Sequence, residues 1–95
     1  MSEPKAIRLT LHAERQATLR GATIEEITTT IRSAKWESAL RGKFQAKKYF
    51  DFNRQSPVNQ QTYRFKTIEA IFADEPNELV VITVKVYYTS KEEEL

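Results

Sequence analysis

The chain has 95 residues, no cysteine, and 15 basic against 13 acidic residues, which gives a formal net charge of +2. This length predicts a single domain over residues 1–95 with one hydrophobic core, and the lack of cysteine excludes disulfides and thiolate metal sites. The first residues lack the apolar run of a signal peptide, and no segment has the roughly 18 apolar residues of a membrane span. We therefore expect a cytoplasmic protein that makes no membrane contact.

The charges are unevenly distributed along the sequence. Residues 41–66 contain seven basic residues and one acid, whereas residues 67–95 contain two basic residues and seven acids. A basic segment favours a polyanion such as nucleic acid, although Lys and Arg also solubilise exposed strand faces. The acidic residues after about position 90 predict a solvated, frayed C-terminal tail.

A strand and a helix are expected at the start of the chain. Residues 6–10 are a short strand candidate that leads directly into residues 11–20, a run of good helix formers. Gly21 follows this run, and glycine is the residue type that most often ends a helix. We therefore expect a first helix with Gly21 as its C-terminal cap.

The second helix is predicted from a capping box. Thr23 is followed three residues later by Glu26, the spacing at which the two side chains cap each other's backbone N–H groups. The helix then runs from Ile24 to about residue 33. Ile24, Ile27 and Ile31 fall on one side of it and are expected to pack against a sheet.

The second half of the chain has the period-two pattern of strands. Residues 43–50 alternate, a polar loop covers residues 53–61, and residues 62–73 alternate again with Ile68, Ala70 and Phe72 on one face. A turn at residues 74–77 precedes the last strand.

The last strand, residues 79–88, is the only long run of β-branched and aromatic residues. Regular alternation predicts a buried face made of Val80, Ile82, Val84, Val86 and Tyr88. The opposite face, with Lys85 and Tyr87 among apolar neighbours, is expected to be partly covered and to carry function. The element order predicts an α+β domain in which two helices pack on one face of a three-stranded antiparallel meander.

Several short stretches resemble a large bacterial family of uncharacterised small proteins. They are His12-Ala13, Arg20-Gly21-Ala22-Thr23, Glu26-Ile27, Tyr49-Phe50-Asp51-Phe52-Asn53, Leu79-Val80-Val81-Ile82-Thr83-Val84 and Tyr87-Tyr88. The resemblance covers nearly the whole chain. That family is similar in turn to the RelE and ParE type of toxin from bacterial toxin–antitoxin pairs, which implies a RelE-like fold. Family members often carry arginine where this chain has Gln16, so a functional arginine there would make this copy altered or inactive.

The resemblance implies a metal-independent endoribonuclease, in which a ribose 2′-hydroxyl attacks the neighbouring phosphate. Such a site needs a proton shuttle, cations and a stacking surface for a base. His12 is the only histidine in the sequence, and histidine is the residue type that most often moves protons at physiological pH. The catalytic candidates are His12, Arg20 and Arg64. The candidates for binding nucleic acid are Arg15, Lys47, Lys48, Lys66, Lys85 and Tyr87, with Tyr49 and Tyr63 as further stacking candidates.

A second class of function fits the same residues. His12 near a helix start is also a common structural residue, and Arg20 also complements the dipole of the first helix. The alternative is therefore a non-catalytic module that binds nucleic acid or a protein partner with the basic surface. RNA and an antitoxin-like protein are the predicted partners, and the oligomeric state stays open. No catalytic triad, glycine-rich phosphate loop or metal-ligand spacing is present in the sequence, so no cofactor or metal is predicted.

Overall fold

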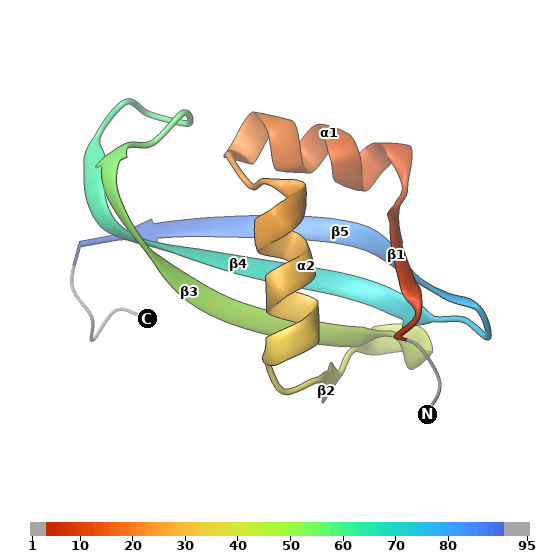
Figure 1. Ribbon diagram of the computed structural model, residues 1–95. Helices are drawn as coiled ribbons and strands as arrows, with labels where there is room; N and C mark the ends of the chain where they lie inside the picture. Colours follow the sequence, from red (N-terminus) through yellow and green to blue (C-terminus); the bar gives the residue numbers. More distant parts are fainter. Residues whose placement is uncertain (1–3, 91–95) are drawn as a thin grey trace.

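The computed structural model describes residues 4–90, and the predicted acidic tail lies largely outside these residues. The elements in chain order are β1 (Ala6–Leu9), α1 (Leu11–Arg20), α2 (Ile24–Ser33), β2 (Glu37–Ser38), the 3₁₀ turn η1 (Leu40–Gly42), β3 (Phe44–Gln55), β4 (Thr62–Asp74) and β5 (Glu78–Thr89). Both helices cover one face of a single sheet (Figure 1). Neither helix is long and apolar enough to cross a membrane.

The structure is an α+β domain, but the sheet is larger than the sequence predicts. Besides the three consecutive antiparallel strands β3, β4 and β5, the sheet of the described residues contains β1 and β2, in the order β1-β5-β4-β3-β2. The pairs β2–β3, β3–β4 and β4–β5 are antiparallel, whereas β1 lies parallel to β5. Parallel pairing needs a long crossover, and here the crossover contains α1, α2, β3 and β4. The sheet is therefore mixed.

The local signals for the two helices are confirmed. Gly21 ends α1 in the left-handed conformation, with φ 86°, and its N–H donates to the Ala17 carbonyl. Thr23 and Glu26 form the predicted capping box at the start of α2. Such caps satisfy backbone N–H and C=O groups that would otherwise have no partner at the helix ends.

The helices bury a narrow stripe against the sheet. Ala13 and Ala17 of α1, and Ile27 and Ile31 of α2, are fully or almost fully buried. Ile24 does not join them: it lies in the first turn of α2 and more than half of it is exposed, so this part of the prediction is wrong. Thr30 is the third buried residue of α2, and its hydroxyl donates to the Glu26 carbonyl.

A β-bulge in β5 changes which residues of the last strand are buried. Ile71 pairs with Thr83 but its neighbour Phe72 pairs with Val81, so Ile82 is an extra residue in β5. An extra residue interrupts the alternation of side chains along the strand. Side chains that regular alternation would put on one face therefore point to opposite faces before and after it. Val84 is therefore on the helix-covered face as predicted, but Val81 is buried there too.

The predicted face of β5 is thus wrong in its first half. Val80 and Ile82 point to the face away from the helices, and Leu79 and Val81 take their place in the core. Beyond the bulge, Val84, Val86 and Tyr88 lie on the helix-covered face as predicted. Lys85 and Tyr87 consequently remain on the opposite face, which we call the open face.

Candidate functional site

The three predicted catalytic residues do not converge. His12 is exposed in the first turn of α1, whose start is held beside β5 by the hydrogen bond from the Thr10 N–H to the Val81 carbonyl. Arg64 lies near the start of β4, next to Phe65, which pairs with Thr89 of β5. Thr89 is eight positions after Val81 in β5, a distance of about 26 Å at ~3.3 Å per residue. The histidine and this arginine therefore belong to opposite ends of the sheet.

Arg20 and Gln16 complete the edge of β5. The pairing of β1 with β5 stops at Val81, so among residues 4–90 no strand lies on that side of the following residues of β5. The Val84 N–H donates to Gln16 Oε1 at 2.8 Å, and Arg20 Nη1 donates to the Val84 carbonyl at 2.7 Å. Two side chains of α1 thus replace the missing strand. An arginine at position 16 would bring only donors, so it would not accept this hydrogen bond.

Lys66 is an internal residue and not a ligand-binding one. It is 3 % exposed, and its Nζ donates to Glu26 Oε1 at 2.8 Å and to the Gly21 carbonyl at 2.9 Å. Burial raises the pKa of the Glu26 carboxyl, but hydrogen bonds from Lys66 and Thr23 outweigh burial and hold this pKa below its ordinary value. Lys66 thus joins β4 to the corner between α1 and α2, and a nucleic acid cannot contact it at this depth.

The connection between β3 and β4 closes over the same corner (Figure 1). Tyr88 Oη donates to the Arg20 carbonyl at 2.5 Å. Burial raises the pKa of the Tyr88 phenol, and the Glu26 carboxylate raises it further. Pro57, in the connection, and Tyr88 both come so close to Gly21 that a side chain there would contact them. This corner is consequently a packed structural junction.

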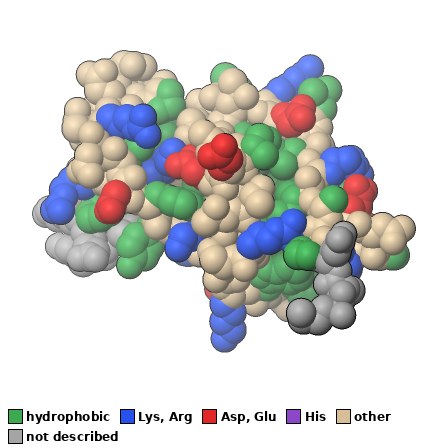
Figure 2. Space-filling view, in the orientation of Figure 1, with side chains coloured by type: hydrophobic (Ala, Val, Ile, Leu, Met, Phe, Trp, Pro, Cys, Tyr) green, Lys and Arg blue, Asp and Glu red, His purple; other side chains and the backbone are tan. Residues whose placement is uncertain are grey.

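The remaining predicted nucleic-acid residues are spread over different surfaces. Arg15 lies on the outer side of α1 beside Leu11 and Leu19. Lys48 is on the helix-covered face, because it pairs with Ile68 in the same row as Val86. Figure 2 shows this face: Lys and Arg side chains are distributed over it among acidic and apolar ones, without forming one basic patch. Lys47, Lys85 and Tyr87 are the three that share the open face.

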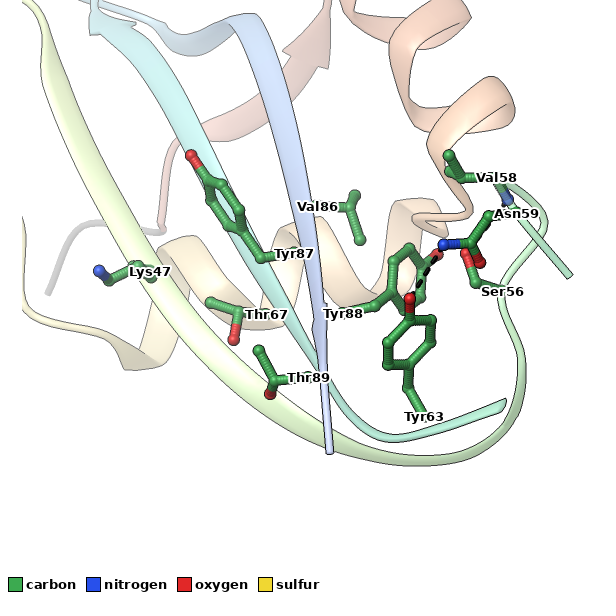
Figure 3. A pocket seen from close by; sticks show the side chains of 10 residues that line it. All are labelled: Lys47, Ser56, Val58, Asn59, Tyr63, Thr67, Val86, Tyr87, Tyr88 and Thr89. Atoms are coloured by element: carbon green, nitrogen blue, oxygen red, sulfur yellow. Dashed lines mark hydrogen bonds between the residues drawn. The ribbon is translucent and has the colours of Figure 1, made fainter. Parts of the chain in front are cut away.

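Strand register arranges the open face in cross-strand rows. From η1 toward the β3–β4 connection these rows are Gln45–Ile71–Thr83, Lys47–Glu69–Lys85, Tyr49–Thr67–Tyr87 and Asp51–Phe65–Thr89. In Figure 3, Lys47, Thr67, Tyr87 and Thr89 lie on one side of the sheet, and Tyr88, Ser56 and Tyr63 lie on the other. We call the second row the lysine row and the third the tyrosine row.

The tyrosine row combines two exposed rings with a buried hydroxyl. Tyr49 is 53 % exposed and Tyr87 is 47 % exposed, whereas Thr67 between them is 6 % exposed. Within residues 4–90, neither the Thr67 nor the Thr89 hydroxyl has a hydrogen-bond partner. A buried hydroxyl without a partner costs about 1–3 kcal/mol, which makes these two groups uncommon.

Positive charge is concentrated at the β3 edge rather than over the whole open face. Lys85 Nζ lies 3.9 Å from Glu69 Oε1, so Glu69 partly neutralises the lysine row. At the edge of β3, a groove is lined by Ala34, Lys35, Lys47, Lys48 and Tyr49, with three lysines and no acid among these described residues. Lys35 was not a predicted site residue. It lies two residues after the end of α2, and nothing in the sequence pattern relates it to β3.

Comparisons of this chain with protein-family models, curated proteins and solved structures found no match. The family resemblance and the RelE-like fold it implies therefore stay predictions.

Proposed function

We propose that this protein is a non-catalytic module that binds single-stranded nucleic acid on the open face of its sheet. The observation that carries the proposal is the tyrosine row lying directly beside the lysine row. Proteins that bind single strands commonly combine aromatic rings, on which bases stack, with a cationic groove that follows the phosphates. Two half-exposed tyrosines and the lysines around them supply both parts on one surface.

The path of the strand follows from the charges. Lys35, Lys47 and Lys48 at the β3 edge are the cations with no acid lining the same groove, so they are the natural contacts for the phosphate backbone. From this edge, bases reach Tyr49 first and Tyr87 two strands farther across the sheet. Lys85 contributes less because Glu69 lies against it. Arg15, on the outer side of α1, is outside this path.

Binding should therefore depend on salt and on the β3 edge. The double variant Lys47→Gln with Lys48→Gln is expected to weaken binding of a fluorescein-labelled 12-nucleotide RNA. It should also reduce the slope of log K against log salt by about 1.4, since each lost phosphate contact of a single strand removes about 0.7. Fluorescence anisotropy titrations at KCl concentrations from about 50 to about 300 mM measure both the affinity and the slope.

Arg15→Gln is the control, because it removes an exposed cation from another surface and should leave the slope unchanged. Equal slopes for the double variant and the unchanged protein would count against the β3 edge. If the unchanged protein showed no salt-sensitive binding at all, the proposed function itself would be lost.

A RelE-like ribonuclease toxin is the second candidate function. It is supported by the order of two N-terminal helices on one face of a largely antiparallel sheet, and by the exposure of His12. It ranks second because His12, Arg20 and Arg64 lie apart and Arg20 is bonded to β5.

Growth experiments test the toxin function. If the protein is a toxin of this kind, its expression arrests growth, and His12→Ala relieves the arrest while circular dichroism shows an unchanged fold. Normal growth during expression of the intact protein, with its accumulation verified by immunoblot, would rule strongly against this activity.

A further inference from the structure

We propose that Tyr49 and Tyr87 hold one unpaired base between their rings, with the Thr67 hydroxyl bonded to the edge of that base. This inference rests on the proposed function and specifies what the open face recognises. It predicts a preference for strands that carry bases over an abasic strand of the same charge, and over a duplex.

The spacing of the strands fits one planar base. Tyr49 and Tyr87 flank Thr67 in the same cross-strand row, so their backbones are two strand spacings apart, about 9.5 Å. A base between two rings makes a contact of about 3.5–4.0 Å on each side and needs roughly 7–8 Å between them. Rings that lean slightly toward each other from these two strands meet this requirement. Their exposure, 53 % and 47 %, leaves both free to do so.

The Thr67 hydroxyl lies between the two tyrosines and is covered in the free protein, so a base reaches it only when the side chains around it move apart. It is buried, it belongs to the central strand of the row, and it has no partner among the described residues. A hydroxyl both donates and accepts hydrogen bonds, and the edges of nucleobases carry donors as well as acceptors. In the next row, the Thr89 hydroxyl also has no partner among the described residues, and Thr89 lines one pocket together with Thr67 and Tyr87 (Figure 3).

The charges around Thr67 favour a base over a phosphate in this position. Glu69 lies two residues after Thr67 on the same face of β4, one row away and about 7 Å along the strand. Its carboxylate repels a phosphate placed at the centre of the row, whereas a neutral base is not repelled. Phosphates are attracted to Lys47 and to the β3 edge beyond it. A duplex cannot use the clamp, because its bases are already stacked and paired.

Thr67→Val is the decisive variant, since valine keeps the shape and removes only the hydroxyl. Thr67→Val should not lower the melting temperature, because the hydroxyl it removes has no partner among residues 4–90. It should weaken binding of a fluorescein-labelled 12-nucleotide oligouridine roughly fivefold, by loss of one hydrogen bond. Its affinity for a 12-unit abasic ribose-phosphate strand should stay unchanged. Thr83→Val, on the same face but two rows away, is the matched control.

The rings are tested separately. Tyr87→Ala should weaken binding of the oligouridine about tenfold, whereas Tyr87→Phe, which keeps the ring, should bind as the unchanged protein does. This pair keeps the test valid even if Thr67→Val folds poorly.

The outcomes separate the two proposals. Selective loss of oligouridine binding in Thr67→Val and Tyr87→Ala, with abasic binding retained, supports the clamp. Equal affinity of the unchanged protein for the oligouridine, the abasic strand and a duplex overturns the clamp, while the salt-sensitive binding would still support the proposed function. A lower melting temperature for Thr67→Val shows a structural hydroxyl and also overturns the role of Thr67. Absence of binding to all three probes overturns both proposals.

Discussion

Replacing Lys66 with alanine is expected to lower the free energy of unfolding by about 3 kcal/mol. Removing one partner of a buried ion pair typically costs about 3–5 kcal/mol, because the other charge stays without a counterion. We expect a loss at the lower end of this range because 21 % of the Glu26 side chain is exposed to solvent. The Gly21 carbonyl also loses its donor. Urea denaturation followed by circular dichroism measures the loss.

Lys85→Ala is the matched control for this prediction. Lys85 also faces a glutamate, but its Nζ lies 3.9 Å from Glu69 and its side chain is 45 % exposed. An exposed pair of this kind contributes about 0–1 kcal/mol. Equal losses for Lys66→Ala and Lys85→Ala would show that the burial of Lys66 does not have the energetic role inferred from its contacts.

The pH dependence of stability is a second readout of the same variant. The pKa of Glu26 is lowered in the folded protein, so its ionised form stabilises the fold above the ordinary glutamate pKa of about 4.3. This contribution is lost as the pH falls through the lowered pKa. Without Lys66 the main cause of the lowering disappears, and the loss of stability below about pH 4 should become shallower. Glu78, whose pKa Arg8 lowers in the same direction, remains in the variant and leaves part of the acid sensitivity.

The two helices were predictable because their signals are local. The glycine after α1 and the Thr23–Glu26 capping box act within one turn of chain, so sequence spacing alone specifies their hydrogen bonds. The extra residue at Ile82 has no such local signal: every residue from Leu79 to Val84 is a good strand former. Only pairing with β4 reveals the bulge, which is why the first half of the buried face was assigned to the wrong residues.

The candidate site was only partly predictable, because charge was counted along the chain and not by strand face. Lys66 is in the same period-two series as the residues predicted to be buried, which are Ile68, Ala70 and Phe72. This periodicity therefore also places Lys66 beneath the helices. Lys85 and Tyr87 were assigned to the open face correctly. Lys35 joins the β3 edge through the chain reversal after α2, which no periodicity in the sequence describes.

The role of Gln16 was beyond sequence reasoning for a related reason. The predicted family resemblance, in which arginine is common at this position, made glutamine suggest a lost function. In the structure it accepts a hydrogen bond from the Val84 N–H, and Arg20 donates to the carbonyl of the same residue. The N–H and the carbonyl of Val84 are therefore both hydrogen-bonded to side chains of α1. This need arises only from the packing of α1 against β5, so no local sequence pattern indicates it.

Gly21→Ala is expected to destabilise the protein more than its backbone conformation explains. At φ 86° a non-glycine residue costs about 1–2 kcal/mol. An added Cβ would also lie 2.5 Å from Tyr88 Oη and 2.7 Å from Pro57 Cγ. To make room, the Tyr88 hydroxyl must leave the Arg20 carbonyl, which puts a further ~1 kcal/mol or more at stake. We therefore expect a total loss above about 2 kcal/mol in urea denaturation.

Gly42→Ala separates the two causes of this loss. Gly42 also has a positive φ, 71°, but an added Cβ there meets nothing within 4 Å, so it reports the backbone cost alone. The difference between the two variants measures the packing of the corner between α1, α2 and the β3–β4 connection. Tyr88→Phe in the Gly21→Ala background should cost less than Tyr88→Phe alone, because the hydroxyl has already been displaced. Gly21→Ala and Gly42→Ala could instead lower the free energy of unfolding equally, with an additive effect of Tyr88→Phe. This result would mean that the corner is loosely packed and that the Arg20-Gly21 pair has a role other than packing.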